Sequence, residues 1–287
     1  MDKRTILITI DLEDWFQVEN FKKYIDFSTW DNREWRFENN TIKLLNLFDQ
    51  YQIKATFFIL GWIAERTPNL VTELQARGHE IASHGYNHDL CSSLDENSIY
   101  DDIKRSKETL ENITGREVIG YRAPSFSISE SVIQILKSLG YKYDSSYNSS
   151  SLNSRHGKID LRSHKKHELA YIDKDGFKEI PMCNLNIGNK IFPWSGGGYF
   201  RLFPLPLFSA GIKQILRKEG AYVFYAHPWE FDPKQPIVKE ASAMNKFRHY
   251  LNLNSNFQKL DKFLSTFKYN QFMTCQEYST YLDTNSL

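Results

Sequence analysis

Two histidines separated by three residues are the first feature of this sequence that could do chemistry. They are His84 and His88, in the segment His-Gly-Tyr-Asn-His. Two imidazoles at this spacing can bind one divalent cation, and a carboxylate would complete a three-ligand site with a position left for water. In a chain with eight histidines an isolated pair would more often be two ordinary polar residues. The surrounding sequence therefore has to decide between the two interpretations.

A group of carboxylates near the N-terminus supplies the missing ligand type. Asp11, Glu13 and Asp14 fall within four residues, and such a cluster is costly unless a cation or an arginine neutralises it. If the preceding strand continues, Asp11 and Glu13 share one face, whereas Asp14 reaches that face only if the chain turns. A solvated acidic loop is the alternative. The residues alone leave both Glu13 and Asp14 as candidate metal ligands.

Two further polar residues complete a possible hydrolytic site. Arg122 can hold the carboxylate of Asp11 ionised and oriented as a general base, and Pro124 fixes the turn that follows. His227 ends an apolar strand and precedes Pro228, a position that suits a general acid. The alternatives are a surface salt bridge for Arg122 and a buried structural histidine for His227.

The elements that must position these residues alternate between short apolar runs and helical periodicity. The strand-like runs are 5–10, 55–60, 80–83, 118–121 and 221–226, and the helical ones are 40–51, 62–77, 95–112, 129–139 and 205–218. Glycines at 78, 115 and 140 end three of the helices. This alternation predicts parallel strands joined by right-handed helical crossovers, in an open sheet or a barrel. The four polar clusters follow strands, so they should meet at one rim.

The pattern becomes irregular between about 147 and 203. That segment contains a Ser/Asn-rich start, a basic patch near Arg162 and a glycine run at 196–198, and we expect loops and short strands there. A long amphipathic helix over 242–267 and a strand near 272–274 follow. We interpret residues 1–287 as one domain, with a core of about 5–145 and 220–230, the insertion at about 147–203 and an extension over 231–287.

In this order and spacing, the clusters resemble those of polysaccharide deacetylases of the NodB-homology group, carbohydrate esterase family four. The segments Gly196-Gly-Gly-Tyr-Phe-Arg201, His227-Pro-Trp-Glu230 and Arg248-His-Tyr-Leu251 resemble the branch associated with bacterial exopolysaccharide loci. The resemblance implies a distorted (β/α)7 barrel with inserted loops and a C-terminal helical extension. It also implies N-deacetylation of amino sugars in a polysaccharide or its precursor, which could be lipid-linked.

The resemblance also assigns roles to individual residues. It makes Asp11 the catalytic base, His84 and His88 metal ligands, Arg122 the residue that orients the base, and His227 the catalytic acid. Without a gap it makes Glu13 the third ligand, whereas a one-residue bulge would make it Asp14. It offers the backbone N–H of Ser125 to the oxyanion, and Asp144 as the aspartate that tunes the acid. The expected cofactor is one divalent ion, Zn²⁺ first, with Co²⁺, Ni²⁺ or Fe²⁺ as alternatives.

Aromatic residues near the same loops could stack against sugar rings. We single out Trp194 beside the glycine run, together with Tyr199 and Trp229, although large aromatics often fill cores instead. Arg201 or Arg248 could bind an anionic sugar group or stabilise the C-terminal region.

The composition excludes several kinds of partner. The chain has 36 Lys and Arg against 35 Asp and Glu, so a net charge of +1 gives no basic field for nucleic acid. Cys91, Cys183 and Cys275 fit neither a disulfide framework nor a CxxC metal site, which favours a reducing compartment. The apolar run at 5–10 is too short for a signal peptide, and no stretch suits a membrane span. We expect a cytoplasmic protein, peripheral to the inner membrane face if its substrate is lipid-linked.

Two other functions compete with deacetylation. One is an allantoinase-like hydrolase of small cyclic amides, which has a related barrel and in some cases an altered metal site. The other is a non-catalytic sugar-binding subunit, which would be expected to lack the base, a ligand or the acid. Every one of those positions is filled in this sequence.

Overall fold

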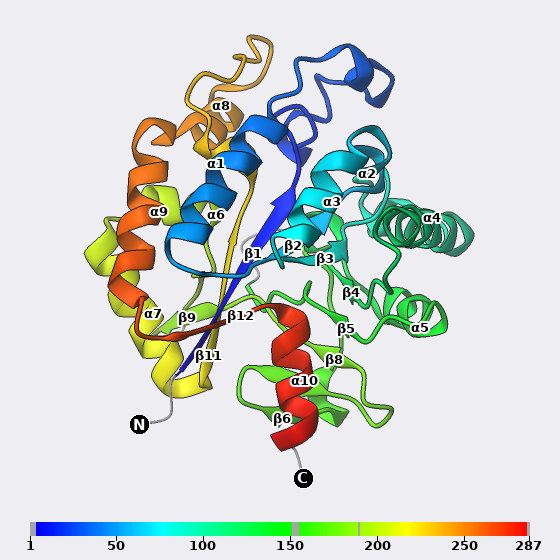
Figure 1. Cartoon of the computed structure of the whole chain (residues 1–287), viewed down its shortest axis with the longest axis vertical. Coiled ribbons are helices and arrows are strands. Elements are labelled where there is room, and N and C mark those ends of the chain that lie inside the picture. The colour runs from blue at the N-terminus through cyan, green and yellow to red at the C-terminus, as the bar shows by residue number, and fades with distance from the viewer. Residues whose placement is uncertain (1–3, 151–154, 189, 286–287) are drawn as a thin grey trace.

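The computed structural model describes residues 4–150, 155–188 and 190–285, and shows a curled sheet wrapped by helices (Figure 1). Parts of the predicted N-terminal start and insertion fall at 1–3, 151–154 and 189, outside the described residues. Along the main path of the sheet the parallel strands are, in spatial order, β11 (Ala221–Ala226), β1 (Thr5–Leu12), β2 (Thr56–Ile59), β3 (Glu80–Ser83), β4 (Gly120–Tyr121), β5 (Tyr143–Asp144) and β8 (Lys178–Glu179). The remaining strands are β6 (Lys165–His167), β7 (Ala170–Ile172), β9 (Asn184–Ile187), β10 (Lys190–Pro193) and β12 (Gln271–Met273).

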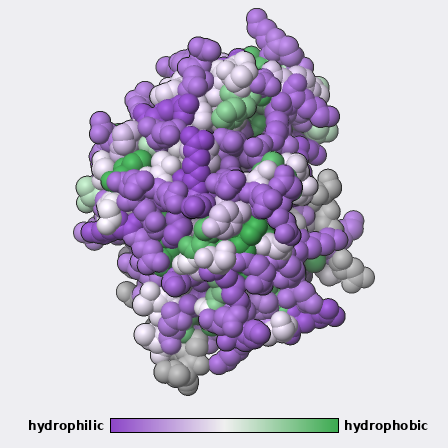
Figure 2. Space-filling model, turned by 90° about the vertical axis from the view of Figure 1, so that its right-hand side faces the viewer, coloured by the Kyte–Doolittle hydropathy of each residue, from purple (hydrophilic) through white to green (hydrophobic). Residues whose placement is uncertain are grey.

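Helices cover the outside of this sheet, as the alternation of the sequence predicts. They are α1 (Phe37–Gln50), α2 (Gly61–Arg66), α3 (Pro68–Ala76), α4 (Glu96–Thr114), α5 (Glu130–Ser138), α6 (Gly197–Leu202), α7 (Leu205–Glu219), α8 (Ala243–Tyr250), α9 (Leu253–Phe267) and α10 (Cys275–Asn285). The space-filling view shows a mostly hydrophilic face on which apolar residues form small, separate groups (Figure 2). The predicted α/β class is confirmed.

Strand β1 is the centre of the sheet because all of its residues are buried. Its apolar side chains, among them Ile6, Leu7 and Ile8, are completely inaccessible to solvent. Thr5–Ile10 pair with β11 on one side, while β12 and β2 share the other side, at opposite ends of the strand. A strand buried on both faces is expected where parallel strands are enclosed by helices.

The gap between β8 and β11 is bridged by the inserted segment. The N–H of Ile180 donates to the carbonyl of Asp144, and the N–H of Trp194 donates to Cys183. The N–H of Tyr225 on β11 then donates to Ser195, and Gly196 forms a parallel bridge with Tyr225. A Cβ on Gly196 would lie 2.0 Å from the carbonyl oxygen of Tyr225, so only glycine permits this approach. The insertion therefore completes the wall of the barrel.

Two predicted helices are each divided into two. The predicted helix 62–77 breaks between α2 and α3 at Thr67, because Pro68 has no N–H and disfavours a helical residue before it. The predicted helix 242–267 breaks between α8 and α9, where Asn252 adopts a left-handed conformation (φ 54°). Asparagine tolerates this conformation better than most residues, but the sequence pattern gives no sign of the break.

The three cysteines are buried and free. In the part of the chain that the structure describes, none of the helices has the length and apolar character needed to cross a bilayer.

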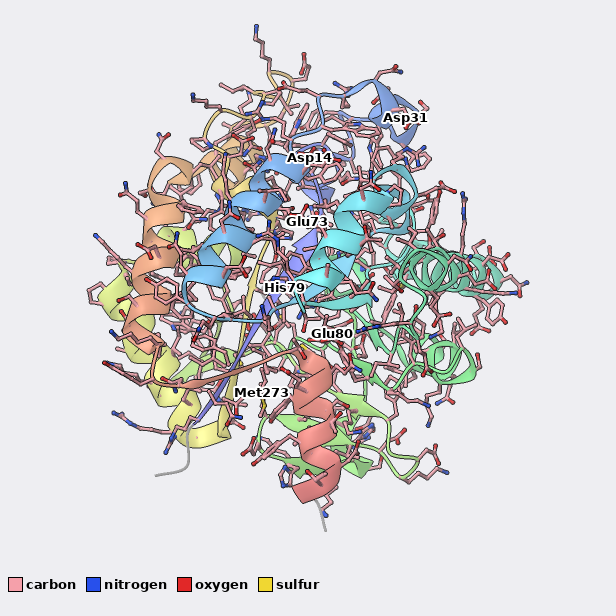
Figure 3. The ribbon with its side chains drawn as sticks, viewed as in Figure 1. Asp14, Asp31, Glu73, His79, Glu80 and Met273 are labelled. Atoms are coloured by element: carbon pink, nitrogen blue, oxygen red, sulfur yellow. The ribbon has the colours of Figure 1, made fainter. Side chains whose placement is uncertain are left out.

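His79 lies directly before β3 (Figure 3). Its titration should make the free energy of unfolding depend on pH. Burial, together with the charge of Lys54, lowers its pKa to about 4, and its Nδ1 accepts a hydrogen bond from the N–H of Ala55 at 3.0 Å. The unfolded chain therefore binds a proton near pH 6.5, while the folded protein binds it only near pH 4. Above about pH 6.5 the titration of His79 does not affect the free energy of unfolding. As the pH falls from about 6.5 to about 4, the free energy of unfolding decreases by up to about 3 kcal/mol.

His79→Gln keeps an acceptor for the N–H of Ala55 but cannot take up a proton. We expect urea unfolding between pH 7 and pH 4 to show a smaller loss of stability in this variant than in the wild type. Equal losses would contradict a neutral, buried imidazole.

Candidate active site

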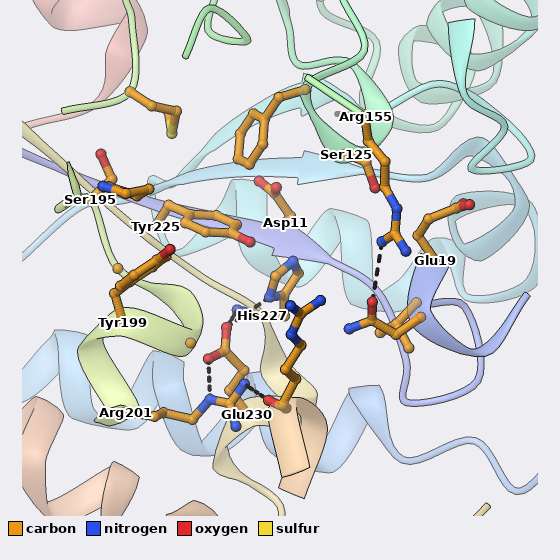
Figure 4. Close-up of a pocket in the computed structure, with 18 of the residues that line it drawn as sticks. Asp11, Glu19, Ser125, Arg155, Ser195, Tyr199, Arg201, Tyr225, His227 and Glu230 are labelled. Atoms are coloured by element: carbon orange, nitrogen blue, oxygen red, sulfur yellow. Dashed lines mark hydrogen bonds and ion pairs between the residues drawn. The ribbon is translucent and has the colours of Figure 1, made fainter. Parts of the chain in front are cut away.

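Side chains that are far apart in sequence meet where four strands end. Asp11 lies on β1, His84 follows β3, Arg122 follows β4 and His227 follows β11. Asp11, His88 and His227 line one cavity of about 640 Å3, and Figure 4 shows Asp11 and His227 in this pocket. The predicted convergence of these residues at one rim is confirmed.

Glu13 lies between the two histidines of the HxxxH segment. Its Oε1 is 3.2 Å from His84 Nε2 and 3.0 Å from His88 Nε2, and all three side chains are buried. His84 Nδ1 lies 2.8 Å from the carbonyl oxygen of Arg122, which fixes the ring. When Nδ1–H donates a hydrogen bond to this carbonyl oxygen, the neutral ring points the lone pair of Nε2 at the carboxylate of Glu13. Two acceptors facing each other at this distance fit a cation between them.

The donor atoms therefore fit a divalent metal ion. One oxygen and two nitrogens from Glu13, His84 and His88 lie within 4.8 Å of one another, and these are the ligand types of hydrolytic zinc sites. Asp11, Glu13 and His227 form a second, overlapping group within the same distance. Burial raises the pKa of Glu13, but the charges of His88 and His227 outweigh burial and hold it well below its usual range. Glu13 is therefore ionised, the form in which a carboxylate binds a metal ion.

Asp14 turns away from this group. Its Oδ1 accepts from the N–H of Trp15 at 2.8 Å, and its Oδ2 accepts from the N–H groups of Arg36 at 2.6 Å and Phe37 at 3.2 Å. The carboxylate thus caps the start of α1, and burial raises its pKa to about 7. The alternative in which Asp14 is the metal ligand is therefore corrected. Its carboxylate instead connects the end of β1 to the start of α1.

The predicted pairing of Asp11 with Arg122 is present. Arg122 Nη1 donates to Asp11 Oδ1 at 2.7 Å and to Thr9 Oγ1 at 2.9 Å. Its Nε and Nη2 donate to the carbonyl oxygen and Oγ of Ser145, both at 2.9 Å. The guanidinium is fully buried and lies 4.1 Å from the centre of the Phe58 ring. Asp11 is therefore held in one orientation, with its Oδ2 3.9 Å from His84 Nε2.

His227 is held by a different carboxylate from the one expected. Its Nδ1 lies 2.7 Å from Glu230 Oε1, and Arg201 Nε donates to Glu230 Oε2 at 2.7 Å (Figure 4). Burial lowers the pKa of His227, but the charges of Glu13, Glu230 and Asp11 outweigh burial and raise it to about 9. Asp144 instead accepts hydrogen bonds from Ser146. The prediction that Asp144 is the carboxylate acting on His227 is therefore corrected.

Glu230 was not singled out by the sequence analysis. It lies three residues after His227, in the short 3-10 helix Pro228–Phe231, and this spacing brings its carboxylate back to the histidine. The same spacing is the sequence signal that could have identified it. Tyr225, two residues before His227, was missed as well; its ring packs edge-on against the imidazole and lines the pocket.

The aromatic residues expected at the pocket divide into two groups. Tyr199 and Trp229 line the cavity, and Trp229 stacks on His227 with ring centres 5.1 Å apart. Trp194 is buried, donates from Nε1 to the carbonyl oxygen of Phe208 and stacks on the Phe203 and Phe208 rings. The prediction that Trp194 contacts substrate is corrected, because its ring is buried against other aromatic side chains and does not line the pocket.

Ser125, the expected oxyanion donor, lies in a strained turn at the pocket wall. Its φ is 50°, in the left-handed region that non-glycine residues seldom adopt, and it lines the same cavity as Asp11 and His88. Strain of this kind is often found where a backbone group has to be presented to a ligand.

Comparison with known proteins agrees with this geometry. Residues 19–143 match the family described as polysaccharide deacetylase. Over these residues the chain is similar to polysaccharide deacetylases. Residues 145–277 match a family described as a domain of unknown function, DUF3473.

Related deacetylases match the chain over part of its length. A peptidoglycan-N-acetylglucosamine deacetylase of Bacillus cereus is 33% identical over 102 residues, which are 36% of this chain and 47% of that protein. The peptidoglycan-N-acetylmuramic acid deacetylase PdaA of Bacillus subtilis is 30% identical over 135 residues, which are 46% of this chain and 50% of that protein. The chain thus spans about a third to a half of the length of the first curated relatives that it matches.

Solved structures show the same fold. A Mycobacterium smegmatis protein described as a polysaccharide deacetylase has a TM-score of 0.66 at 19% identity, covering 100% of this chain and 93% of that one. A family 4 carbohydrate esterase from Streptomyces lividans has a TM-score of 0.52 at 12% identity, covering 96% and 93%. A pseudoenzyme of the family from Bacillus anthracis has a TM-score of 0.54 at 13% identity, covering 96% and 66%. The predicted barrel of the NodB type is confirmed.

Both matched segments of the chain contribute to one pocket. Its lining includes His88 and Ser125 from the first segment, and Tyr199, His227 and Glu230 from the second. The segment of unknown function therefore supplies the residue expected to act as the acid and the pair of charges behind it.

Arg201→Met should destabilise this protein strongly. Arg201 and Glu230 are both buried, and Arg201 also donates to the backbone carbonyls of Arg248, His249 and Leu251. Removing one partner of a buried pair leaves an uncompensated charge, at a cost of about 3–5 kcal/mol in the free energy of unfolding. Urea unfolding measures it. Arg217→Met, at an exposed position on α7, is the matched control and should change stability by less than about 0.5 kcal/mol.

Proposed function

We propose that this protein hydrolyses the N-acetyl groups of amino sugars in a polysaccharide or its precursor and releases acetate. One observation carries the proposal: the carboxylate of Glu13, set between two imidazoles, lies in the same pocket as Asp11, which is paired with Arg122, and as the His227–Glu230 pair. A cation-binding group, a base and an acid are the parts that amide hydrolysis needs.

The residues of the chain divide the reaction between them. A divalent ion held by Glu13, His84 and His88 would supply Lewis acidity toward the acetyl oxygen and a more acidic water. Asp11, kept in place by Arg122, accepts a proton from the attacking water, and the oxygen of that water adds to the acetyl carbon. The N–H of Ser125 donates to the oxyanion that develops. His227, held by Glu230, gives a proton to the amine nitrogen as the C–N bond breaks, and acetate leaves.

The substrate and the ion are proposed from the same pocket. Its volume and its aromatic wall of Tyr199 and Trp229 suit an oligosaccharide segment. We propose Zn²⁺ as the ion, with Co²⁺, Ni²⁺ or Fe²⁺ as functional replacements, since one carboxylate and two imidazoles accept each of them. The resemblance to the exopolysaccharide branch favours an exopolysaccharide or its lipid-linked precursor, acting at the inner face of the membrane.

Ligand substitutions should remove the metal and the activity together. We expect His84→Ala to lose tightly bound metal by elemental analysis and to release no acetate from N-acetylhexosamine oligomers. Ser145→Ala is the control. Among the proposed site residues Ser145 contacts only Arg122, so this variant should keep the metal. Full acetate release by metal-free His84→Ala would contradict the proposed site.

Substitution of the base should separate metal binding from turnover. Asp11→Asn keeps the size of the side chain and its acceptor for Arg122, but cannot take the proton of water, so we expect normal metal content and a loss of kcat of about 10²–10⁴-fold. Sugar binding by the wild type without acetate release under any of the four metals would instead support a non-catalytic subunit, like the pseudoenzyme with this fold. Opening of small cyclic amides would support the allantoinase-like alternative.

A further inference from the structure

Two buried carboxyl side chains lie together behind Arg122, and the proposed mechanism does not use them. Asp144 on β5 and Glu179 on β8 are register partners, with exposures of 0% and 2%. Asp144 accepts from the N–H of Ser146 at 3.0 Å and from its Oγ at 2.6 Å. Glu179 Oε1 accepts from the N–H of Tyr147 at 2.9 Å. Glu179 Oε2 is buried without any such donor among the described residues.

The surroundings of this pair cannot neutralise two negative charges. Arg122 is the cation that acts on both carboxyls, and it is already paired with Asp11. Among the described residues, the other titratable groups beside the pair include Cys91, Tyr121, Tyr147 and Tyr171, a thiol and three phenols that carry no positive charge. Two adjacent buried carboxyls with less than one available positive charge between them hold one proton.

We propose that Glu179 carries this proton on Oε2 and donates it to Asp144, and that the pair positions the segment Arg122–Ser125. The assignment to Glu179 follows from the hydrogen bonds. Asp144 already accepts two, as an ionised carboxylate does, whereas Glu179 Oε2 has no donor and the Glu179 side chain interacts with Asp144. Burial raises the pKa of both groups. The charge of Asp144 raises the pKa of Glu179 further, whereas the hydrogen bond from Glu179 lowers that of Asp144.

The pair reaches the catalytic segment through a serine hydroxyl. Because Ser146 Oγ donates its proton to Asp144, its lone pairs are left to accept from the N–H of Ala123 at 2.8 Å. Ala123 stands between Arg122 and the turn that contains Ser125. The neighbouring Ser145 binds the guanidinium of Arg122 and donates to the carbonyl oxygen of Ile180, next to Glu179. The ends of β5 and β8 thus form one support for the segment.

The effect of this pair on catalysis rests on the proposed function. The position of the proton can nevertheless be measured without turnover. We expect the infrared difference spectrum between the wild type and Glu179→Gln at pH 7 to show the loss of one carbonyl stretch of a protonated carboxyl group. Glu80, another buried carboxyl with a raised pKa, is present in both proteins and cancels. Loss of carboxylate bands instead would overturn the proposal.

The positioning role is tested by comparing two substitutions of Glu179. Glutamine keeps an N–H donor for Asp144 and an acceptor for Tyr147, whereas leucine keeps only the volume. We expect Glu179→Gln to retain kcat within about twofold, and Glu179→Leu to lose kcat about tenfold or more with KM and metal content nearly unchanged. Equal losses in the two variants would refute positioning by a neutral glutamic acid. If the wild type itself released no acetate, the proposed function would fail, and the infrared result would still decide where the proton lies.

Discussion

The buried guanidinium of Arg122 is the interaction on which the rest of the site depends. It joins three strands, because its donors reach Asp11 and Thr9 on β1 and Ser145 after β5, while its own carbonyl holds the ring of His84. A buried cation is tolerated only when its hydrogen bonds are satisfied and its charge is balanced. The contacts that satisfy Arg122 also fix Asp11, the proposed base, and the imidazole of His84.

A second set of charges supports the other side of the pocket. Arg201, Glu230 and His227 form a buried chain from α6 to the end of β11, and Arg201 also binds carbonyls at the end of α8. The C-terminal helices are therefore connected to the proposed acid. The insertion also supports the pocket, because Ser195 and Gly196 pair with Tyr225 on β11. Residues 145–277, the segment of unknown function, are in these respects part of the pocket wall.

The repeating pattern of strand and helix could be predicted because burial imposes a local periodicity on each element. β1, β2, β3 and β11 lie within two residues of their expected bounds. The breaks at Thr67 and Asn252 were missed. Pro68 marks the first break in the sequence, whereas the helical pattern gives no sign of the second. Trp194 was placed wrongly because an aromatic beside a glycine run looks the same in sequence whether it faces a core or a pocket.

The sequence by itself determined the types of groups available: two imidazoles four residues apart, a cluster of carboxylates at a strand end, an arginine and a histidine at two others. It could do so because strand ends in a parallel sheet converge whatever the details of packing. Only the tertiary structure decided between Glu13 and Asp14, and between Asp144 and Glu230 as the partner of His227. Those choices depend on the direction in which a side chain leaves a turn, and that direction is set by contacts with Arg36, Phe37 and Arg201, residues distant in the chain.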